Sequence, residues 1–311
     1  MRRMKSHHGQ PDEQGAILIL VVFLTVTLIA MAALVVDVGA LLDERRQLQN
    51  GADAGALAVA HSCVLGACDA TLAEGLADAN ARDGDSAVDS VTYPAANQAR
   101  VTTSTKNGGE SILPYAFGQV LTGQKGKTVR ATSTAAWGPP SSATVLPLVI
   151  SECDVTQLGI GTESVIMFAK ANGPCVAKDA SGAFGWLSTA CPAIVVVGAT
   201  LPGDPGGSGP AGCLEPRLGK NVVLPVFDTV TGTGNNTRYH IVGFVAFHLT
   251  GWRFANTSSA PRPCSSPNTC VSGSFVRYLI SDEIGTDTGT GVGSGVGMGS
   301  GYGVSRIFLI S

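Results

Sequence analysis

The longest hydrophobic pattern in the chain is an unbroken apolar run over residues 16–36, which contains no charged side chain. At about 1.5 Å of rise per residue, a helix over these positions spans about 30 Å, the thickness of the hydrocarbon core of a bilayer. A cleaved secretory signal has a shorter apolar region, of roughly 7–15 residues, and ends at a small-x-small site. Asp37 follows this run where such a site would stand. The pattern therefore predicts a retained transmembrane helix over residues 16–36.

Beyond Asp37 the pattern changes to that of an amphipathic helix. Apolar or small residues recur at steps of three, four and six, close to one helical face, and no proline interrupts them before residue 61. We therefore predict one helix from about residue 16 to residue 60, apolar all round in lipid and amphipathic over residues 37–61. The apolar or small positions of its second part are Leu41, Leu42, Leu48, Ala52, Ala56 and Ala60.

Small residues form a stripe on this second part. Alanines repeat every four positions, and Gly51 and Gly55 repeat one position earlier. Small side chains at i and i+4 let another backbone approach closely. Two interpretations stay open: the stripe binds a partner helix, or it packs on the chain's own globular body. On the first, the two aspartates could pair with partner cations, and the candidate partner-binding residues are Asp37, Gln49, Ala52, Asp53, Ala56 and Ala60.

The rest of the chain alternates short apolar segments with turns rich in Pro and Gly, which predicts a small α+β unit and then a mainly-β body. In the unit, residues 62–138, we expect strands at 90–93, 99–105 and 129–137 and a helix at 112–121. In the body, residues 139–284, we expect strands at 145–150, 165–169, 194–197, 222–227, 239–254 and 271–280, and an exposed loop at 201–212. Residues 285–311 read as a Gly-rich tail that ends in a short strand at 304–310. The predicted fold class is α+β and membrane-anchored.

The charges beside the apolar run predict its orientation. Basic residues in short flanking segments favour the cytoplasmic side, and a long polar segment after a first span is translocated largely regardless of its charge. We therefore expect residues 1–15 to form a cytoplasmic tail and the remainder beyond residue 37 to be extracytoplasmic, in a single-pass protein of the cell membrane. The basic residues before the run are Arg2, Arg3 and Lys5; Arg45 and Arg46 follow it beside Asp37, Asp43 and Glu44.

Composition agrees with an envelope protein. Charged residues make up 14% of the 311 residues, well below the roughly 25% of soluble domains, and the mean hydropathy is +0.25. The net charge of −3 gives no basic footprint of the kind that nucleic-acid binding requires. We therefore expect membrane lipid and proteins as partners, and no nucleic acid.

The cysteines are even in number, and outside the cytoplasm they would form disulfides. Two short spacings, between Cys63 and Cys68 and between Cys264 and Cys270, predict two local bridges; the other pairings stay open. Zinc is disfavoured, because there is no Cys-x-x-Cys and only His61 lies near a cysteine pair. The disulfide candidates are Cys63, Cys68, Cys153, Cys175, Cys191, Cys213, Cys264 and Cys270.

Residues 13–61 carry a specific combination: Glu-Gln-Gly-Ala before the apolar run, Asp-x-Gly after it, then an arginine, a Leu-Gln pair and an alanine-rich stretch. This segment resembles the amino-terminal part of TadG/TadE-like Flp (tight adherence) pilus-assembly proteins. Residues 184–187 and 238–254 resemble carboxy-terminal parts of the actinobacterial members. The resemblance implies assembly or anchoring of a Flp-type pilus or a related secretion apparatus, with pilin-like or pilus-assembly proteins as partners and self-association through the helix. The matching residues are Asp37, Gly39, Arg46, Leu48, Gln49, Ala52, Asp53, Ala54, Ala56, Leu57 and Ala58.

The chain departs from the family pattern at two places. Relatives that a prepilin peptidase cleaves typically have a glutamate five positions past the cleavage glycine; counted from Gly15, that position is Leu20. Larger members carry a von Willebrand A domain that binds metal through Asp-x-Ser-x-Ser, and the nearest string, residues 179–183, lacks the second serine. Neither cleavage nor a metal-binding adhesion domain is supported.

Catalytic signatures are missing from the sequence. A hydrolase needs a nucleophile, a base and an orienting acid, and no Gly-x-Ser-x-Gly elbow accompanies the residues of suitable type. Asp282 and Glu283 are adjacent and would point to opposite faces of an extended chain. We expect a protein that is not an enzyme and needs no cofactor or metal. Two alternatives remain: a carbohydrate-binding or surface-ligand-binding module on the same anchor, and a secreted hydrolase that uses residues among His240, His248, Asp228 and Ser274.

Overall fold

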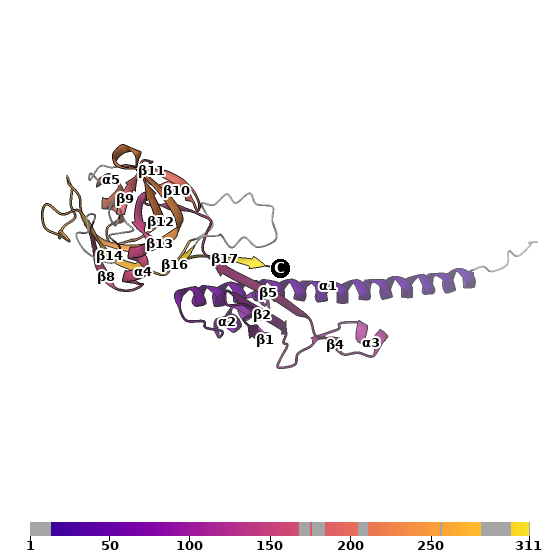
Figure 1. Ribbon diagram of the computed structural model, residues 1–311. Coiled ribbons are helices and arrows are strands. Elements are labelled where there is room, and N and C mark those ends of the chain that lie inside the picture. Colours follow the sequence, from indigo (N-terminus) through magenta and orange to yellow (C-terminus); the bar gives the residue numbers. More distant parts are fainter. Residues whose placement is uncertain are drawn as a thin grey trace, which may run out of the picture. The chain divides into compact units, whose positions relative to one another are not determined.

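The computed structural model describes residues 14–167, 175, 184–204, 211–255, 257–280 and 300–310 (Figure 1). The described residues group into two compact units. The first takes its residues from Met1–Gly55, Ala73–Val91 and Val101–Thr132, and the second from Ala56–Leu72, Thr92–Arg100 and Ser133–Ser311. The expectations for residues 1–13, for the string 179–183, for Asp282 and Glu283, and for residues 285–299 fall outside the described residues.

The long amino-terminal helix is confirmed. Helix α1 (Gln14–Leu65) runs without a break through the apolar run and the amphipathic segment. Its two polar side chains in the apolar run, Thr25 and Thr27, turn their hydroxyls back onto the helix. The Thr27 Oγ1 donates to the carbonyl of Phe23 at 2.8 Å, and the Thr25 Oγ1 donates to Val21 and Val22. Because these hydroxyls are satisfied within the helix, they add little to the cost of an apolar environment.

The first unit packs a short helix and strands on α1. Its elements are α2 (Leu72–Asn80), β1 (Ser86–Thr92), β2 (Gln98–Thr105), β3 (Leu113–Pro114), α3 (Gly118–Thr122), β4 (Gly126–Lys127) and the start of β5 (Arg130–Gly138). The Thr103 Oγ1 on β2 donates to the carbonyl of Leu48 on α1 at 2.9 Å. Strand β5 begins and ends within a residue of the expected bounds, whereas β1 begins four residues before the expected strand.

The expected helix over residues 112–121 is wrong. Residues 113–114 instead form β3, which pairs antiparallel with β4, and only Gly118–Thr122 are helical. Pro114 explains part of the difference, because proline has no N–H to donate and clashes with the preceding turn of a helix. The apolar residues do recur at helical spacing, but this spacing carries no information about the turn or about β4, the strand that pairs with β3.

The second unit is mainly β, as the fold class required. Its elements are the end of β5, β6 (Ser142–Val145), β7 (Leu148–Ser151), α4 (Glu152–Leu158), β8 (Glu163–Met167), β9 (Phe184–Leu187), β10 (Ala193–Val196), β11 (Thr200–Asp204), α5 (Ala211–Leu214), η1 (Glu215–Arg217), β12 (Asn221–Thr231), η2 (Gly234–Asn236), β13 (Arg238–Arg253), β14 (Cys270–Val276), β15 (Tyr278–Leu279), β16 (Ser300–Tyr302) and β17 (Val304–Ile310). The α+β class, a long apolar helix followed by a mainly-β body, is therefore confirmed.

The largest sheet has the order β11-β9-β7-β12-β13-β14-β8, with β16 also pairing with β13. Strand β11 additionally pairs with β13, so the pairings β11-β9-β7-β12-β13 close into a ring. Another sheet has the order β1-β2-β5-β17-β15, in which β17 pairs antiparallel with the end of β5, Ile310 opposite Thr134. Strands β6 and β10 form a separate pair.

Close packing of Tyr239 on two glycines accompanies the ring closure. A Cβ at Gly185 on β9 would lie 2.1 Å from the Tyr239 hydroxyl, and one at Gly203 on β11 would lie 2.6 Å from its ring. Only glycine lets both strands approach β13 this closely. Burial raises the pKa of the Tyr239 phenol, which therefore stays neutral.

Both faces of the central strands are buried, which explains their continuous apolar runs. On β12, Leu224 and Val226 belong to one apolar cluster, and Val223 and Phe227 to the other. A strand that is covered on both faces loses the apolar–polar alternation that marks a half-exposed strand. The first cluster also contains Trp186, Trp252, Phe247 and Phe275, and the second contains Phe244 and Ile241.

Two expectations for the body need correction. Residues 145–150 do not form one strand, because Leu146 and Pro147 separate β6 from β7. The expected loop over residues 201–212 begins instead with the last residues of β11, which pair with β9 and β13. Strand β13 is continuous over sixteen residues, and its register against β14 shifts between Leu249 and Gly251.

Candidate functional site

The first part of α1 exposes its apolar side chains. Phe23 is 72% exposed and Leu18 is 67% exposed, and none of the most apolar stretch of the helix is buried inside the protein. Among the described residues, α1 is the one helix long and apolar enough to cross a membrane. Contiguous apolar surface of this extent is unfavourable in water and marks a membrane or protein contact. The helix is therefore a candidate membrane anchor.

Asp37 stands at the end of the exposed apolar stretch and is buried. Its Oδ1 accepts a hydrogen bond from the Ala116 N–H at 2.8 Å, and both carboxylate oxygens accept from the Phe117 N–H, at 3.3 and 3.2 Å. The Oδ2 also accepts from the Gly118 N–H. These N–H groups precede or begin α3 and have no partner within that helix, so the carboxylate satisfies them. The Asp37 carboxylate therefore makes contacts within the first unit, and its pairing with a partner's cation stays a prediction.

Gln49 and Asp53 are half-buried and contact each other. The Gln49 Nε2 donates to the Asp53 Oδ1 at 2.9 Å, one helical turn away, and to the carbonyl of Thr132 at 3.4 Å. Both side chains therefore take part in contacts within the first unit, and a role in binding a partner stays a prediction.

The small-residue stripe is covered by the chain itself. Ala52, Ala56 and Ala60 each have 0% exposure. A Cβ on Gly51 would lie 3.1 Å from the Cα of Ala77, and one on Gly55 would lie 3.3 Å from the Cβ of Ala73. The glycines thus let α2 approach α1 closely. Of the two interpretations left open by the sequence, this burial favours packing on the chain's own body.

An exposed stripe follows the membrane-proximal end of α1 at four-residue steps: Leu42, Arg46 and Asn50. Leu42 is 52% exposed. The candidate partner-binding residues chosen from the sequence did not include this stripe, although Arg46 is one of the residues that carry the family resemblance. Arg46 and Asn50 are among the polar and charged positions left over once the buried alanines are placed on one face, whereas Leu42 was expected on the apolar face and is exposed instead.

All eight cysteines are paired. The two expected local bridges, Cys63–Cys68 and Cys264–Cys270, are confirmed. The longer pairings, which the sequence left open, are Cys153–Cys175 and Cys191–Cys213. Disulfides persist in oxidising compartments and are rare in the reducing cytoplasm. The four bridges therefore favour an oxidising compartment for the folded body.

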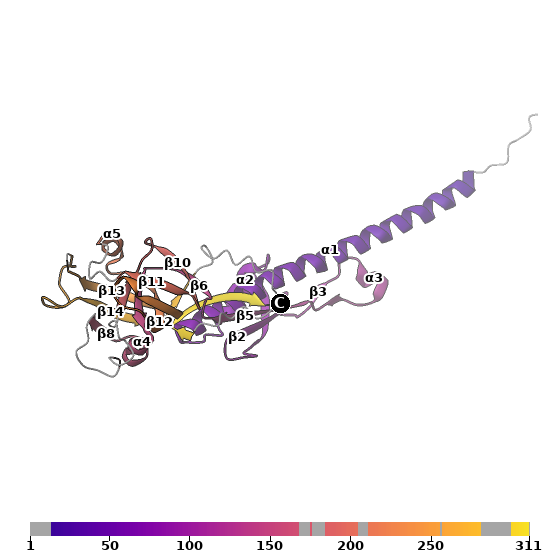
Figure 2. The same ribbon diagram turned by 45° about the horizontal axis from the view of Figure 1, so that its top comes forward.

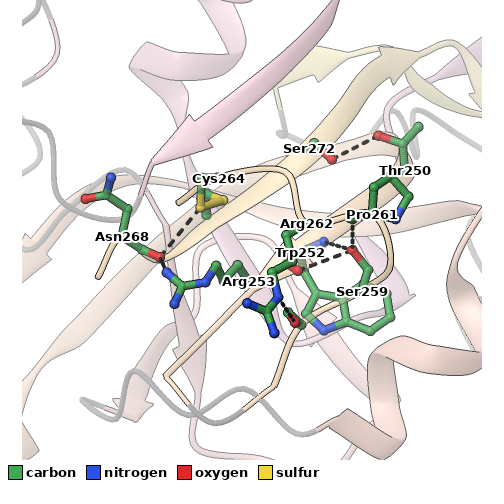
Figure 3. Close-up of a disulfide and its surroundings, with 11 residues drawn as sticks. Thr250, Trp252, Arg253, Ser259, Pro261, Arg262, Cys264, Asn268 and Ser272 are labelled. Atoms are coloured by element: carbon green, nitrogen blue, oxygen red, sulfur yellow. Dashed lines mark hydrogen bonds between the residues drawn. A yellow bond between two sulfur atoms is a disulfide. The ribbon is translucent and has the colours of Figure 1, made fainter. Parts of the chain in front are cut away.

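Figure 3 shows the surroundings of the Cys264–Cys270 bridge in the connection between β13 and β14. The Arg253 Nη1 donates to the carbonyl of Asn268 at 2.7 Å, and the Ser259 Oγ accepts from the Trp252 N–H at 3.0 Å. The same hydroxyl donates to the carbonyl of Pro261 at 3.0 Å. The bridge and these hydrogen bonds hold a long connection without regular secondary structure.

The hydrolase candidates are not brought together. His240 Nδ1 and Asp228 Oδ1 lie 2.8 Å apart, but Ser274 stands opposite His248, eight positions further along β13. At about 3.3 Å per residue, this separates Ser274 from His240 by roughly 25 Å. His248 pairs with Asn221, an amide that cannot act as the orienting acid. These four residues therefore do not form a triad.

The body also contains a polar pocket of about 600 Å³ beside the Asp228–His240 pair. Glu152 stands at its wall, where the Tyr302 hydroxyl donates to its Oε1 at 2.6 Å. Within the described residues, no group of three or more His, Cys, Asp or Glu side chains could hold a metal ion. The polar residues lining the pocket are Ser151, Glu152, Thr156, Gln157, Asp228 and Thr229.

Comparison with known families gives one match. Residues 15–62 match the family model described as "Putative Flp pilus-assembly TadE/G-like". The match coincides with α1, from the start of the apolar run to the buried stripe, and confirms the resemblance of the amino-terminal segment; the resemblance of residues 184–187 and 238–254 to actinobacterial members stays a prediction. A search of curated proteins and a search of solved structures found no match. The amino-terminal segment is therefore TadE/G-like, and together with the candidate membrane helix it supports a pilus-assembly membrane protein.

Proposed function

We propose that the chain is a single-pass membrane protein that assembles or anchors a Flp/Tad-type pilus, or a related secretion apparatus, through protein–protein contacts. The observation that carries this proposal is the coincidence of the family match with α1. The helix has a fully exposed apolar part, suited to lipid, and a second part integrated into the folded protein. An anchor joined rigidly to a folded unit can hold that unit at a fixed place in an assembly.

The orientation is part of the proposal: the residues before the apolar run lie in the cytoplasm and the body lies outside. The basic residues Arg2, Arg3 and Lys5 support it. The four disulfides support it independently, because bridges of this kind are rare in the reducing cytoplasm.

The partner surface we favour is the exposed stripe Leu42, Arg46 and Asn50. Buried alanines cannot touch a partner without unfolding their surroundings, whereas these three side chains are exposed just beyond the proposed membrane span. The stripe offers one apolar, one cationic and one amide group at successive turns, which fits a partner helix that presents a carboxylate.

Two arginines allow a matched test of this surface. In Arg46→Glu the exposed stripe reverses its charge, whereas Arg45→Glu makes the same change at the neighbouring exposed position, about 100° around the helix. We expect Arg46→Glu to abolish co-purification with pilin-like or assembly proteins and to reduce surface pili, and Arg45→Glu to leave both near wild type. Equal losses in the two variants would exclude the stripe as the specific contact.

Anchoring and orientation are tested on the full chain in its own membrane. We expect the protein to stay with membranes through carbonate washing, and its body to be digested by protease added outside intact spheroplasts. Release by carbonate would exclude the anchor, and protection of the body would exclude the orientation.

The pocket beside Asp228 favours a second candidate function, binding of a carbohydrate or similar hydroxyl-rich ligand. Its wall combines carboxylates, hydroxyls and an amide, the groups that hydrogen-bond sugar hydroxyls. The test is a glycan array probed with the full chain in detergent, with Glu152→Gln as the matched variant. A saturable signal that this variant loses supports the second function, and no signal above background excludes it.

A further inference from the structure

The α3 hairpin, residues 113–127, is an appendage of the first unit. Strands β3 and β4 pair antiparallel, with Leu113 opposite Lys127, and the Tyr115 N–H donates to the carbonyl of Lys125 at 3.0 Å. Helix α3 forms the tip and ends at Gly123, whose φ of 72° lies in the left-handed region that glycine favours. Figure 2 shows α3 beside α1, away from β2 and nearer the apolar end of the helix, as Figure 1 also does.

Asp37 fixes the tip of this hairpin at one height along α1. Its carboxylate accepts from three successive N–H groups, those of Ala116, Phe117 and Gly118. A Cβ on Gly118 would lie 2.8 Å from the Asp37 Oδ2, so the approach depends on glycine there. Asp37 directly follows the last residue of the apolar run. If that run fills the hydrocarbon core, the tip lies at the edge of the core.

The tip exposes apolar side chains at this height. Val120 is 91% exposed, more than any other large hydrophobic residue described, and Phe117 is 50% exposed. Exposure of these apolar side chains to water is unfavourable, and their transfer into an apolar environment stabilises the protein. Interfacial elements place such groups about 5–10 Å into the boundary between headgroups and acyl chains, a depth within reach of a tip held at Asp37.

The charge of the hairpin fits a lipid surface. Lys125 and Lys127 are its charged side chains, and residues 111–129 include no aspartate or glutamate. Lysines beside exposed apolar and aromatic groups are typical of segments that bind anionic headgroups. Tyr115, half-buried at the base of the tip, adds an aromatic group of the kind found at membrane interfaces.

We propose that the α3 hairpin is a second membrane contact: Phe117 and Val120 insert among the lipids of the leaflet that faces the body, and Lys125 and Lys127 bind anionic headgroups. The inference rests on the proposed anchoring of α1. It adds a function that the anchor alone does not supply, because two attachments on one rigid unit fix its tilt as well as its distance from the membrane.

The test uses spin labels on the full chain in nanodiscs of zwitterionic and anionic lipid. Since the native cysteines are paired, one added cysteine is the single thiol to label. Val120→Cys reports the tip, Ser90→Cys on the exposed part of β1 is the aqueous control, and Leu28→Cys reports the proposed span. Collision rates with oxygen, which concentrates in lipid, and with a water-soluble nickel complex are measured for each label.

We expect the ratio of oxygen to nickel collisions at Val120→Cys to exceed that at Ser90→Cys several-fold, and to fall in nanodiscs without anionic lipid or in the Lys125→Glu/Lys127→Glu variant. Frequent nickel collisions at the tip would overturn the inference, and so would low rates for both reagents, which indicate a protein contact such as a second copy. A lipid-like ratio at Leu28→Cys with a watery tip refutes the hairpin contact alone, whereas water at both labels refutes the anchor.

Discussion

Within the single helix α1, residues 17–36 and residues 48–64 are both rich in apolar side chains but have opposite exposure. In the first stretch the large side chains Leu20 and Ile29 are 65% and 67% exposed. In the second, Leu48 is 3% exposed and Val59 is fully buried. The first stretch uses large branched residues all round, whereas the second uses alanine and glycine on the side that is covered.

The difference shows how residue size selects the environment of a helix. Lipid chains conform to any side chain, so a membrane-facing surface needs only bulk and apolarity. A protein neighbour has a fixed shape, and close approach of α2 to α1 needs glycine at residues 51 and 55. Small residues beyond a membrane span therefore do not by themselves indicate a partner protein, since the chain's own helix can use them.

The largest expected effect on stability comes from placing tryptophan, the same bulky residue, in each half of α1. Ala56→Trp forces an indole into a fully buried position, and we expect it to cost at least about 3 kcal/mol of unfolding free energy. Ala32 is exposed on the proposed membrane span, so Ala32→Trp should change stability by less than about 0.5 kcal/mol. Urea unfolding of the full chain in nanodiscs measures both. Equal tolerance at the two positions would mean that the alanine stripe is not packed in the native protein.

Next in size is the loss of the Asp37 carboxylate, which stands between the two halves of α1 and holds the tip of the α3 hairpin. Asp37→Asn replaces one carboxylate oxygen by an NH₂ group, which faces the backbone N–H donors and cannot accept from them, and should cost about 1–3 kcal/mol because at least one of the three N–H groups loses its acceptor. Hydrogen exchange should speed up selectively at residues 116–118. The control is Asp53→Asn, which makes the same change at a half-buried contact with Gln49 and should leave that exchange unchanged. Unaltered exchange in Asp37→Asn would show that the α3 hairpin is held by other contacts.

Much of α1 could be predicted because its signals are local. An apolar run, an aspartate and a small-residue repeat each lie within a few turns of the same helix, so periodicity alone placed its ends within about five residues of Gln14 and Leu65. The strand at 304–310 and the bridges Cys63–Cys68 and Cys264–Cys270 were predicted for the same reason: a short pattern or a short spacing sufficed.

The parts that escaped prediction depend on distant residues. Asp37 contacts residues about 80 positions later, so its role as acceptor for the tip of the α3 hairpin has no local signature. Strand β11 exists through its pairing with Tyr239 and neighbours on β13, not through its own glycine- and proline-containing sequence. Cys153–Cys175 and Cys191–Cys213 could not be chosen from the other pairings by spacing alone.

Substitution of alanine for a glycine in each part of α1 should change stability by a smaller amount, with opposite signs in the two parts. A Cβ at Gly39 meets nothing within 4 Å, whereas one at Gly51 lies 3.1 Å from the backbone of Ala77. Gly39→Ala should stabilise the helix by about 0.5–1 kcal/mol through its better helix propensity. Gly51→Ala should lose about 1 kcal/mol, because overpacking against a backbone atom outweighs that gain. The midpoints of thermal unfolding of the two variants test this expectation. Stabilisation by both substitutions would mean that α2 can move away from α1.

The smallest expected effect on stability concerns a polar contact of the folded unit, of a kind that the exposed apolar half of α1 lacks the side chains to make. Burial raises the pKa of the Asp89 carboxyl, but hydrogen bonds from Ser104 at 2.6 Å and Arg130 at 2.7 Å, and the charge of Arg130, outweigh it and leave the pKa below its ordinary value. A lowered pKa in the folded state stabilises the protein above the unfolded pKa of about 3.9, and the contribution is lost as the pH falls through the folded value. Arg130 is largely exposed, so the contribution should stay within about 1 kcal/mol at neutral pH. Wild type and Asp89→Asn should therefore differ slightly at pH 7 and converge in acid, as followed by urea unfolding across pH. A difference that persists at low pH would assign the stabilisation to side-chain shape and not to charge.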